Sequence, residues 1–262
     1  MIKNHFFIFV GKKVMGFFTF MGGLANLAGQ SFYLTFVPPF KKYRVIEQMK
    51  KAGYDSLPIV SLISLFIGFI FALQMAYFMQ RMGSEIYIAS LVALALVREL
   101  SPVLTALVVA GRVGAAITAE LGSMQVTEQI DALETLATNP IKYLVVPRFL
   151  ALSLVLPLLT IYANAVGIFG SYLICVYKLG ISSSLYLNVT FEALLPKDLF
   201  TGLFKTIFFG MIIALVSCYE GFNVEGGAEG VGRATMRSVV ITFILIIVAD
   251  CFFTALFYFI FP

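Results

Sequence analysis

Five long apolar segments, separated by short polar stretches, follow one another after residue 56. They are residues 57–80, 86–119, 144–177, 200–219 and 238–261. An α-helix needs about 20 apolar residues to cross a hydrocarbon core about 30 Å thick. The pattern therefore predicts an all-α integral membrane protein with five spanning helices. The second and third segments are long enough to overshoot the bilayer, tilt or break.

The residues before these segments mix Phe-rich patches with basic ones. Lys12, Lys13 and the pair Pro38–Pro39 interrupt the apolar runs, so the region lacks the continuous core of a secretory signal peptide. We predict one or two N-terminal interfacial helices, with Phe side chains toward the acyl chains and Lys side chains toward anionic headgroups. The chain thus divides into an interfacial segment, residues 1–56, and a five-span domain, residues 57–262.

The distribution of basic residues predicts the orientation of the spans. Eight of the 18 Lys and Arg residues precede residue 57, which places the N-terminus in the cytoplasm by the positive-inside rule. Five crossings then place the C-terminus on the outer side. The stretches 120–143 and 220–237 should be cytoplasmic, whereas 81–85 and 178–199 should face outward, the latter with a short surface helix.

The composition supports a membrane protein and excludes several kinds of chemistry. Hydrophobic residues make up 60% of the chain and charged residues 12%, with a mean hydropathy of +0.97, whereas a soluble domain is about a quarter charged. One histidine, His5, and three scattered cysteines exclude a His/Cys metal cluster, a disulfide framework and a convincing hydrolase triad. No G-x-x-x-x-G-K-[ST] run is present, so any ATP must be used by a partner. We expect no directly bound cofactor and no nucleic-acid partner.

The loop between the second and third spans has the pattern of a short amphipathic helix, at about residues 125–138. Three acids recur at intervals of three, opposite an apolar stripe of Val126, Ile130, Leu133 and Ala137. Thr127 is the predicted N-cap, and Asn139–Pro140 is the predicted stop. The residues expected to contact a partner are Glu128, Ile130, Asp131, Leu133 and Glu134.

Two interpretations of this helix stay open. It could be a solvated connector whose apolar stripe rests on the membrane. Anionic headgroups, however, repel acids, and three acids in seven residues are unusual in a cytoplasmic loop. A partner with a basic groove fits the pattern better. In a transporter without its own nucleotide site, such a helix would contact a separate ATPase and transmit its movement to the spans.

Charged residues inside the apolar segments are the strongest candidates for a polar site at membrane depth. They are Arg98, Glu99, Lys205 and Asp250. Each costs about 2.5 to 3.5 kcal/mol at a helix centre, so these groups should face protein or water. Pro102 has no N–H for the carbonyl four residues earlier, that of Arg98, and should kink the helix there. The four groups could neutralise one another as a packing network, or they could contact substrate or gate its passage.

Two further patterns concern the spans. Small residues recur at helical spacing in the second span (Ala106, Ala110, Gly114, Thr118) and in the third (Ala163, Gly167, Ser171). They let helices approach closely, within the subunit or at a dimer interface. The outer half of the first span offers flexible and aromatic side chains for an acyl-chain cavity, although core packing explains them equally well: Phe71, Gln74, Phe78, Met79 and Met82.

The sequence LVRELSPVLTALVVAGRVGAAITAELGSMQVTEQIDAL, residues 96–133, closely resembles the core of the MlaE/YrbE permeases. Within it, EQIDAL, residues 128–133, is similar to that family's loop signature E-[EQ]-x-D-A-[LM]. Pro140 and Pro147-Arg148-Phe149 continue the likeness. The resemblance runs from about residue 15 to the C-terminus and is loose in the outer loop after residue 178.

The resemblance implies an MlaE-like fold and the role of a permease subunit in an ABC transporter of lipids, usually glycerophospholipids. It also implies a homodimer in the bacterial inner membrane, an ABC ATPase below it, a ring of MCE-domain lipid-binding proteins above it and, in some systems, a small STAS-type regulatory subunit. A lipid would lie between the two copies, near Phe78, Glu99 and Asp250. The alternatives are an ion- or proton-coupled carrier that uses Glu99 or Asp250, and a membrane enzyme acting on lipids.

Overall fold

The computed structural model describes residues 2–38 and 42–260, which are helical almost throughout and contain no strand. Five helices in these ranges are long and apolar enough to cross a membrane, as the sequence predicts. The first is the continuous run Lys42–Arg81, made of α2 (Lys42–Gly53), a 3₁₀ turn (Tyr54–Ser56) and α3 (Leu57–Arg81). The expected boundary at residue 56 therefore lies inside one continuous helical run.

The second and third spans contain π-helical turns. In the second span, α4 (Ile88–Ala95), α5 (Ser101–Val109) and α6 (Ala115–Val126) alternate with the π-turns Leu96–Leu100 and Ala110–Gly114. The run Ile88–Val126 stays helical through both π-turns, so these turns do not break the second span. The third span begins with the π-turn Ile141–Val145 and continues as α8 (Val146–Tyr177).

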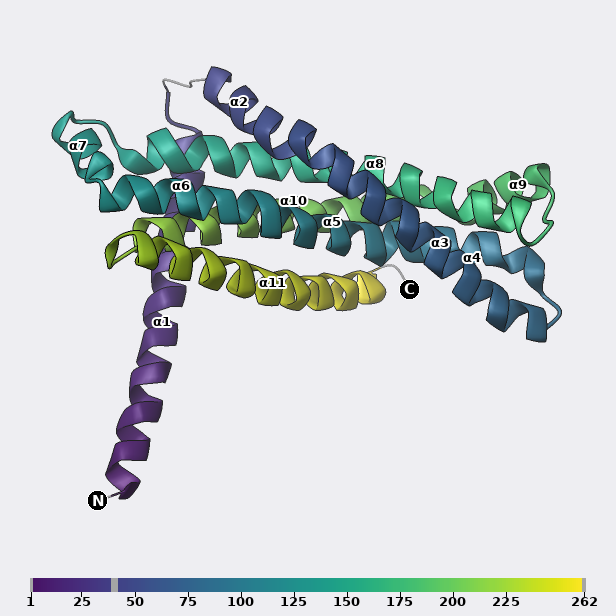
Figure 1. The fold of residues 1–262 in the computed structure, drawn as a ribbon, viewed down its shortest axis with the longest axis horizontal. Helices are drawn as coiled ribbons and strands as arrows, with labels where there is room; N and C mark the ends of the chain where they lie inside the picture. Colours follow the sequence, from purple (N-terminus) through teal and green to yellow (C-terminus); the bar gives the residue numbers. More distant parts are fainter. Residues whose placement is uncertain (1, 39–41, 261–262) are drawn as a thin grey trace.

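The remaining helices complete the bundle. Between the second and third spans lies α7 (Gln129–Thr135), and α9 (Ser183–Ala193) follows the third span. The fourth and fifth spans are α10 (Pro196–Phe222) and α11 (Gly227–Ile260). The N-terminal helix α1 (Ile2–Thr35) lies across the bundle near one end, as a helix on the membrane surface would (Figure 1).

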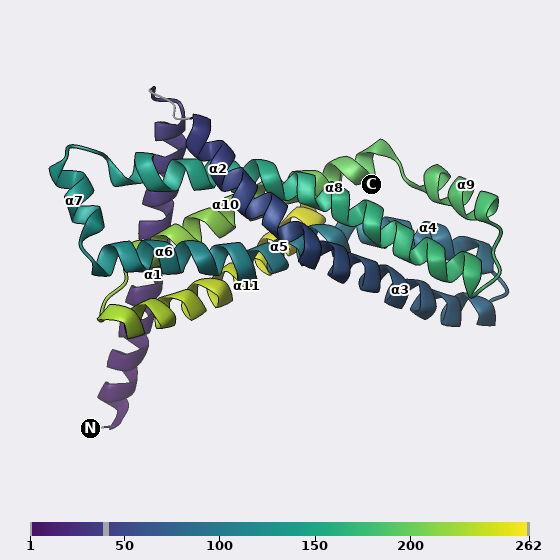
Figure 2. The ribbon, with the colours of Figure 1, turned by 45° about the horizontal axis from the view of Figure 1, so that its top comes forward.

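The connections alternate between the two ends of the bundle as predicted. One end carries α7 and the turn from α10 to α11, and the other carries α9 and the turn from α3 to α4 (Figure 2). Since α1 also lies near the end with α7, we refer to that end as the predicted cytoplasmic end.

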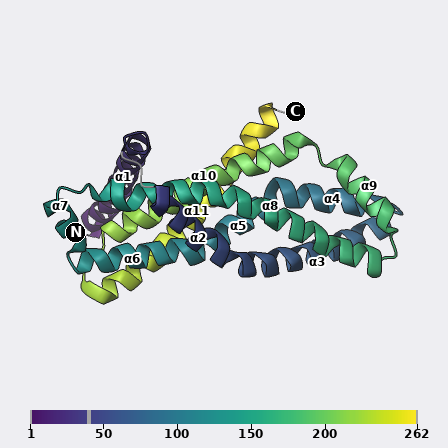
Figure 3. The ribbon, with the colours of Figure 1, turned by 90° about the horizontal axis from the view of Figure 1, so that it is seen from above.

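Burial differs sharply among the spans. In the most apolar window of the third span 72% of residues are buried, compared with 22% in the first and 17% in the fifth. The third span is therefore the centre of the core, where α8 packs against α3 and α10 (Figure 3). The first and fifth spans turn much of their apolar surface outward, toward lipid or another chain.

Both predicted stripes of small residues pack within the subunit. A Cβ added to Gly114 would lie 2.9 Å from the hydroxyl of Ser217 in α10. A Cβ added to Gly68 of α3 would lie 2.0 Å from the carbonyl oxygen of Gly167 in α8. The stripes thus set the close approach of α6 to α10 and of α3 to α8.

Replacing Gly68 with Ala should therefore destabilise the fold by about 1–3 kcal/mol, the usual cost of forcing a methyl group into a full interface. The backbone of α8 must move to make room, because the clashing atom is a carbonyl oxygen. The measurement is thermal unfolding of the purified protein in detergent. Gly232→Ala is the matched control, because Gly232 lies in α11 with nothing within 4 Å of its added Cβ. Equal melting of the two variants would contradict the packing assigned to Gly68.

Candidate functional site

Three of the four predicted intramembrane charges meet at one buried ammonium group. Lys205 of α10 is 2% exposed, and its Nζ lies 2.7 Å from Glu99 Oε2 and 3.0 Å from Asp250 Oδ1. The same Nζ donates to the Thr254 hydroxyl at 2.7 Å. The second, fourth and fifth spans are therefore joined at one point, here called the Lys205 cluster (Lys205, Glu99, Asp250, Thr254).

The π-turn before Pro102 shapes this cluster. Pro102 cannot donate to the carbonyl of Arg98, and that carbonyl instead lies 3.4 Å from Lys205 Nζ, which donates to it. Gly202, one helical turn before Lys205, lets α10 come close, because a Cβ there would lie 2.3 Å from the carbonyl oxygen of Val97. Pro102 and Gly202 together place the Lys205 ammonium group against the π-turn Leu96–Leu100.

Arg98, the fourth charge, pairs elsewhere. Its Nε donates to Asp198 Oδ1 at 2.7 Å, and Asp198 is 2% exposed. The other oxygen of Asp198 accepts the backbone N–H of Leu195 at 3.1 Å and so caps the start of α10. The idea that the four charges neutralise one another is thus wrong for Arg98. Asp198 was not among the predicted charges because the fourth apolar segment begins at residue 200, although an acid just after Pro196 is a typical helix-start signal.

A cleft of about 150 Å³ opens beside these charges. Arg98, Glu99, Asp198 and Lys205 line its polar side, and Phe257 and Tyr258 of α11 line its aromatic side. The second, fourth and fifth spans form it, without the first. The cleft offers cations and carboxylates next to aromatic rings, so it suits a molecule with a charged and an apolar part.

The candidate residues on the first span lie elsewhere. Phe71 and Met79 are half-buried against the core around α4 and α8, whereas Gln74, Phe78 and Met82 are exposed. Within one chain, α3 packs on α8 and α4, while α11 packs on α10 and α6 (Figure 3). The two sets of candidates therefore occupy different faces of the subunit.

The predicted cytoplasmic helix is present as α7, with different ends. Thr127 is not its N-cap, because the Thr127 hydroxyl donates back to the carbonyl of Ser123 at 2.8 Å, at the end of α6. Asn139 is not a stop: its Oδ1 accepts the N–H groups of Ile141 and Lys142 at 2.9 and 3.2 Å and caps the third span. Instead, Glu128 and Ala137, both with positive φ (56° and 53°), bracket α7. These left-handed residues turn the chain sharply at both ends of the helix.

The faces of α7 largely match the prediction. Ile130 is buried and Leu133 is half-buried, and both pack on the main core, whereas Val126 and Ala137 of the expected stripe are exposed. The three acids Glu128, Asp131 and Glu134 are exposed and have no ion-pair partner within the described part of the chain. Asp131 and Glu134 line a cleft of about 680 Å³ at this end of the bundle. The helix is thus anchored by its apolar side and presents uncompensated negative charge to the outside.

Three further ion pairs hold the spans together and were not anticipated. Arg148 is buried and pairs with Glu120 at 2.9 Å, and Arg237 pairs with the fully buried Glu220 at 2.5 Å. Arg112 donates to the Ser56 hydroxyl at 2.8 Å and lies 3.8 Å from Asp55. Each pair joins residues that lie far apart in the sequence or on different helices, so no local pattern could have revealed it.

Comparisons with known proteins show which family the chain resembles. The model of the family described as "Permease MlaE" matches residues 45–256. A probable ABC transporter permease protein of Rickettsia felis is 43% identical over 95% of this chain and 96% of its own length. One of Synechocystis is 40% identical over 86% of each chain. The chloroplast protein TRIGALACTOSYLDIACYLGLYCEROL 1 of Arabidopsis thaliana is 40% identical over 81% of this chain and 61% of its own length.

Proposed function

This chain belongs to the MlaE permease family, and we propose that it is the membrane subunit of an ABC transporter that moves lipids, most of all phospholipids. The observation that carries the proposal is the cleft beside the Lys205 cluster, where buried charges adjoin Phe257 and Tyr258. A phospholipid has the matching chemistry, a charged headgroup on apolar chains. The name of the Arabidopsis relative contains that of a diacylglycerol lipid, which agrees with a lipid substrate.

Membership of a family of ABC transporter permeases implies a separate ATPase, and the exposed acids of α7 are the surface we assign to it. The sequence has no P-loop of its own, so we assign ATP hydrolysis to that partner and a non-catalytic role to this subunit. Movement of α7 would reach the bundle through Ile130 and Leu133, which pack on the main core.

We further propose a homodimer in the bacterial inner membrane, with the N-terminus cytoplasmic and the C-terminus periplasmic. The outward apolar surfaces of the first and fifth spans support it, since a second copy could cover them. The lipid would lie between the copies, with Phe78 of the first span, Glu99 and Asp250 near it. An MCE-domain protein would receive or deliver the lipid on the outer side, and a small STAS-type subunit could regulate the ATPase.

An ion- or proton-coupled carrier is the second candidate, and the geometry disfavours it. In that model a coupling cation would bind to Glu99 or Asp250. The ammonium group of Lys205 already lies at 2.7 and 3.0 Å from these two carboxylates. Lys205 therefore supplies the positive charge that a transported cation would supply in the carrier model.

Copurification and transport together test the proposed function. The tagged chain, purified from its own cells, should bring an ATPase with it, and the complex in vesicles should move labelled phospholipid only when ATP is supplied. The inactive control is the same complex with a non-hydrolysable nucleotide. Movement that follows an ion gradient and persists without ATP would instead support the carrier, and purification without any ATPase would refute the ABC assignment.

A further inference from the structure

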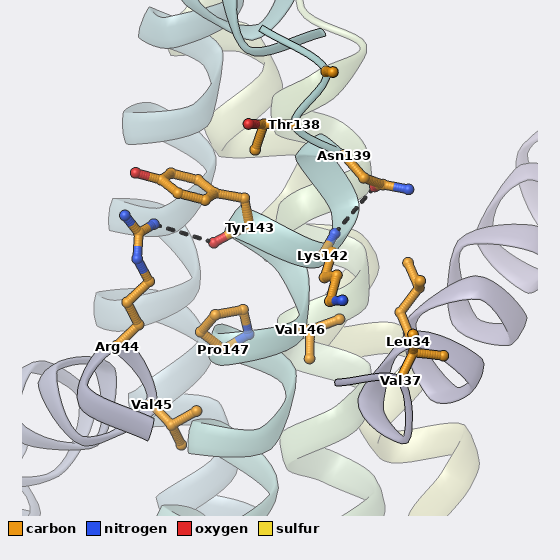
Figure 4. Close-up of a pocket in the computed structure, with 11 residues that line it drawn as sticks. Leu34, Val37, Arg44, Val45, Thr138, Asn139, Lys142, Tyr143, Val146 and Pro147 are labelled. Carbon is orange, nitrogen blue, oxygen red and sulfur yellow. Dashed lines mark hydrogen bonds between the residues drawn. The ribbon is translucent and has the colours of Figure 1, made fainter. Parts of the chain in front are cut away.

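Another pocket, at the predicted cytoplasmic end, has no part in the proposed transport path. Its volume is about 380 Å³, and it lies where the end of α1, the start of α2 and the start of the third span meet (Figure 4). Leu34 lies at the end of α1 and Val37 just after it, Val45 lies in α2, and Val146 and Pro147 lie in the third span. These side chains give the pocket an apolar lining.

Two cations, Arg44 and Lys142, lie among these apolar residues and are half-buried. The Arg44 guanidinium carbon lies 3.3 Å from the centroid of the Tyr143 ring, and its Nη1 donates to the Tyr143 carbonyl at 3.5 Å (Figure 4). Lys142 Nζ donates to the carbonyl of Pro38 at 3.1 Å. These contacts hold both side chains in place without cancelling their charge.

No carboxylate lies within ion-pair distance of either cation among the described residues, which include every Asp and Glu of the chain. By contrast, Arg98, Arg112, Arg148 and Lys205 each have an acid partner. Partly buried charge without a counter-charge is costly. The pocket therefore calls for an anion from outside the chain.

We propose that this pocket binds the phosphate of an anionic phospholipid from the cytoplasmic leaflet, as a resident lipid separate from the transported one. The phosphate would accept hydrogen bonds from Arg44 and Lys142, and the glycerol and first acyl carbons would contact Leu34, Val37 and Val45. This inference requires that the bundle spans a membrane and does not depend on the identity of the transported substrate.

An acidic segment of a partner protein is the competing occupant, and the neighbouring charges disfavour it. The exposed acids of α7 predict a basic partner surface at this end of the bundle, and such a surface would be repelled by Arg44 and Lys142. An anionic lipid headgroup has the charge opposite to that of Arg44 and Lys142, and it would lie at the membrane surface next to this pocket. The chemistry next to α7 thus favours the lipid.

The position of the pocket gives the bound lipid a mechanical consequence. Ala137, Thr138 and Asn139, which connect α7 to the third span, line it together with residues of α1 and α2. They also line the acidic cleft of α7 on their other side. A lipid here would contact α1, the first span and the connection that must bend when α7 moves. Its presence should therefore change how strongly the ATPase is coupled to the spans.

Native mass spectrometry of the full-length protein tests the proposal. The protein is exchanged into mixed micelles of phosphatidylcholine and phosphatidylglycerol, and the lipids that stay bound are counted. We expect phosphatidylglycerol to be retained preferentially. R44Q/K142Q should lower its retention by at least about tenfold, because two charge-assisted hydrogen bonds are lost. K42Q/K50Q, which removes two exposed lysines of α2, is the matched control and should retain the lipid.

Other variants separate binding from folding and from other anions. V45W fills the pocket while keeping both charges, so it should also lower retention, whereas R44K/K142R keeps the charges and should preserve it. Equal retention in R44Q/K142Q and wild type would overturn the proposal. So would displacement of phosphatidylglycerol from the pocket by inorganic phosphate at equal concentration, which would indicate a free-phosphate site. Loss of the ATPase from R44Q/K142Q with unchanged lipid retention would assign the pocket to a protein partner instead.

Discussion

Replacing Lys205 with Met should destabilise the protein by about 3–5 kcal/mol, enough to prevent recovery of a folded membrane protein in many cases. The substitution removes the cation that contacts both Glu99 and Asp250 and leaves two carboxylates facing each other at membrane depth. It also removes the Lys205 ammonium group that donates to the carbonyl of Arg98. Pro102 has no N–H to donate to that carbonyl. The measurement is the yield and thermal unfolding of the purified protein, with Lys178→Met, a change at an exposed lysine, as control.

The triple variant K205M/E99Q/D250N decides what the Lys205 cluster is for. Its amides can hydrogen-bond without charge, and replacing a whole buried ionic group is often close to neutral for stability. We therefore expect it to recover most of the stability lost in K205M. If the folded triple variant still moves lipid, the cluster serves packing alone, and if transport is lost, the charges contact the headgroup or gate its path. A stable K205M single variant would contradict the geometry itself.

The Glu99→Gln single variant should keep the fold, because the amide can still accept from Lys205, and transport should fall if the carboxylate serves the substrate.

The fold was largely predictable from the sequence, because the bilayer imposes a simple length rule on apolar segments. The five spans and the alternation of the loops follow from it, whereas the N-terminal helix was predicted from the mixture of Phe-rich and basic patches before residue 57. The ends of α7 were not predictable in the same way. Thr127 and Asn139–Pro140 carry signals that fit the end of one helix and the start of the next equally well, and the backbone turns at Glu128 and Ala137 depend on how the two long spans are held apart.

The candidate site was predictable in its members but not in its pairings. A charged side chain inside an apolar segment needs a polar or oppositely charged partner. Glu99, Lys205 and Asp250 could therefore be identified without a structure. Which charge meets which depends on helix rotation and on close approaches such as that at Gly202. Arg98 therefore pairs with Asp198, which was not among the predicted charges. The candidates on the first span lie on another face of the subunit.

Replacing Asp131 and Glu134 with Asn and Gln should uncouple the permease from its ATPase while leaving the fold intact. Both side chains are exposed and unpaired among the described residues, so the change should alter stability by no more than about 0.5 kcal/mol. Close charge pairs between proteins contribute about 1.5 kcal/mol or more each, so the loss of two should weaken ATPase binding by at least about a hundredfold. Quantitative pull-down and ATP-driven lipid transport are the two measurements.

E225Q/E229Q is the matched control for this prediction, since it removes two exposed acids at the same end of the bundle, outside α7. The reversal D131K/E134K should be more severe than the neutral variant, because it adds repulsion from a basic groove to the loss of attraction. If α7 were a solvated connector resting on the membrane, both changes would instead favour its contact with anionic headgroups and leave the ATPase bound. Retained ATPase and transport in D131K/E134K would therefore decide for the connector. A graded loss from D131N/E134Q to D131K/E134K, with E225Q/E229Q unchanged, would assign the coupling surface to α7, because only a specific basic partner distinguishes these three double variants.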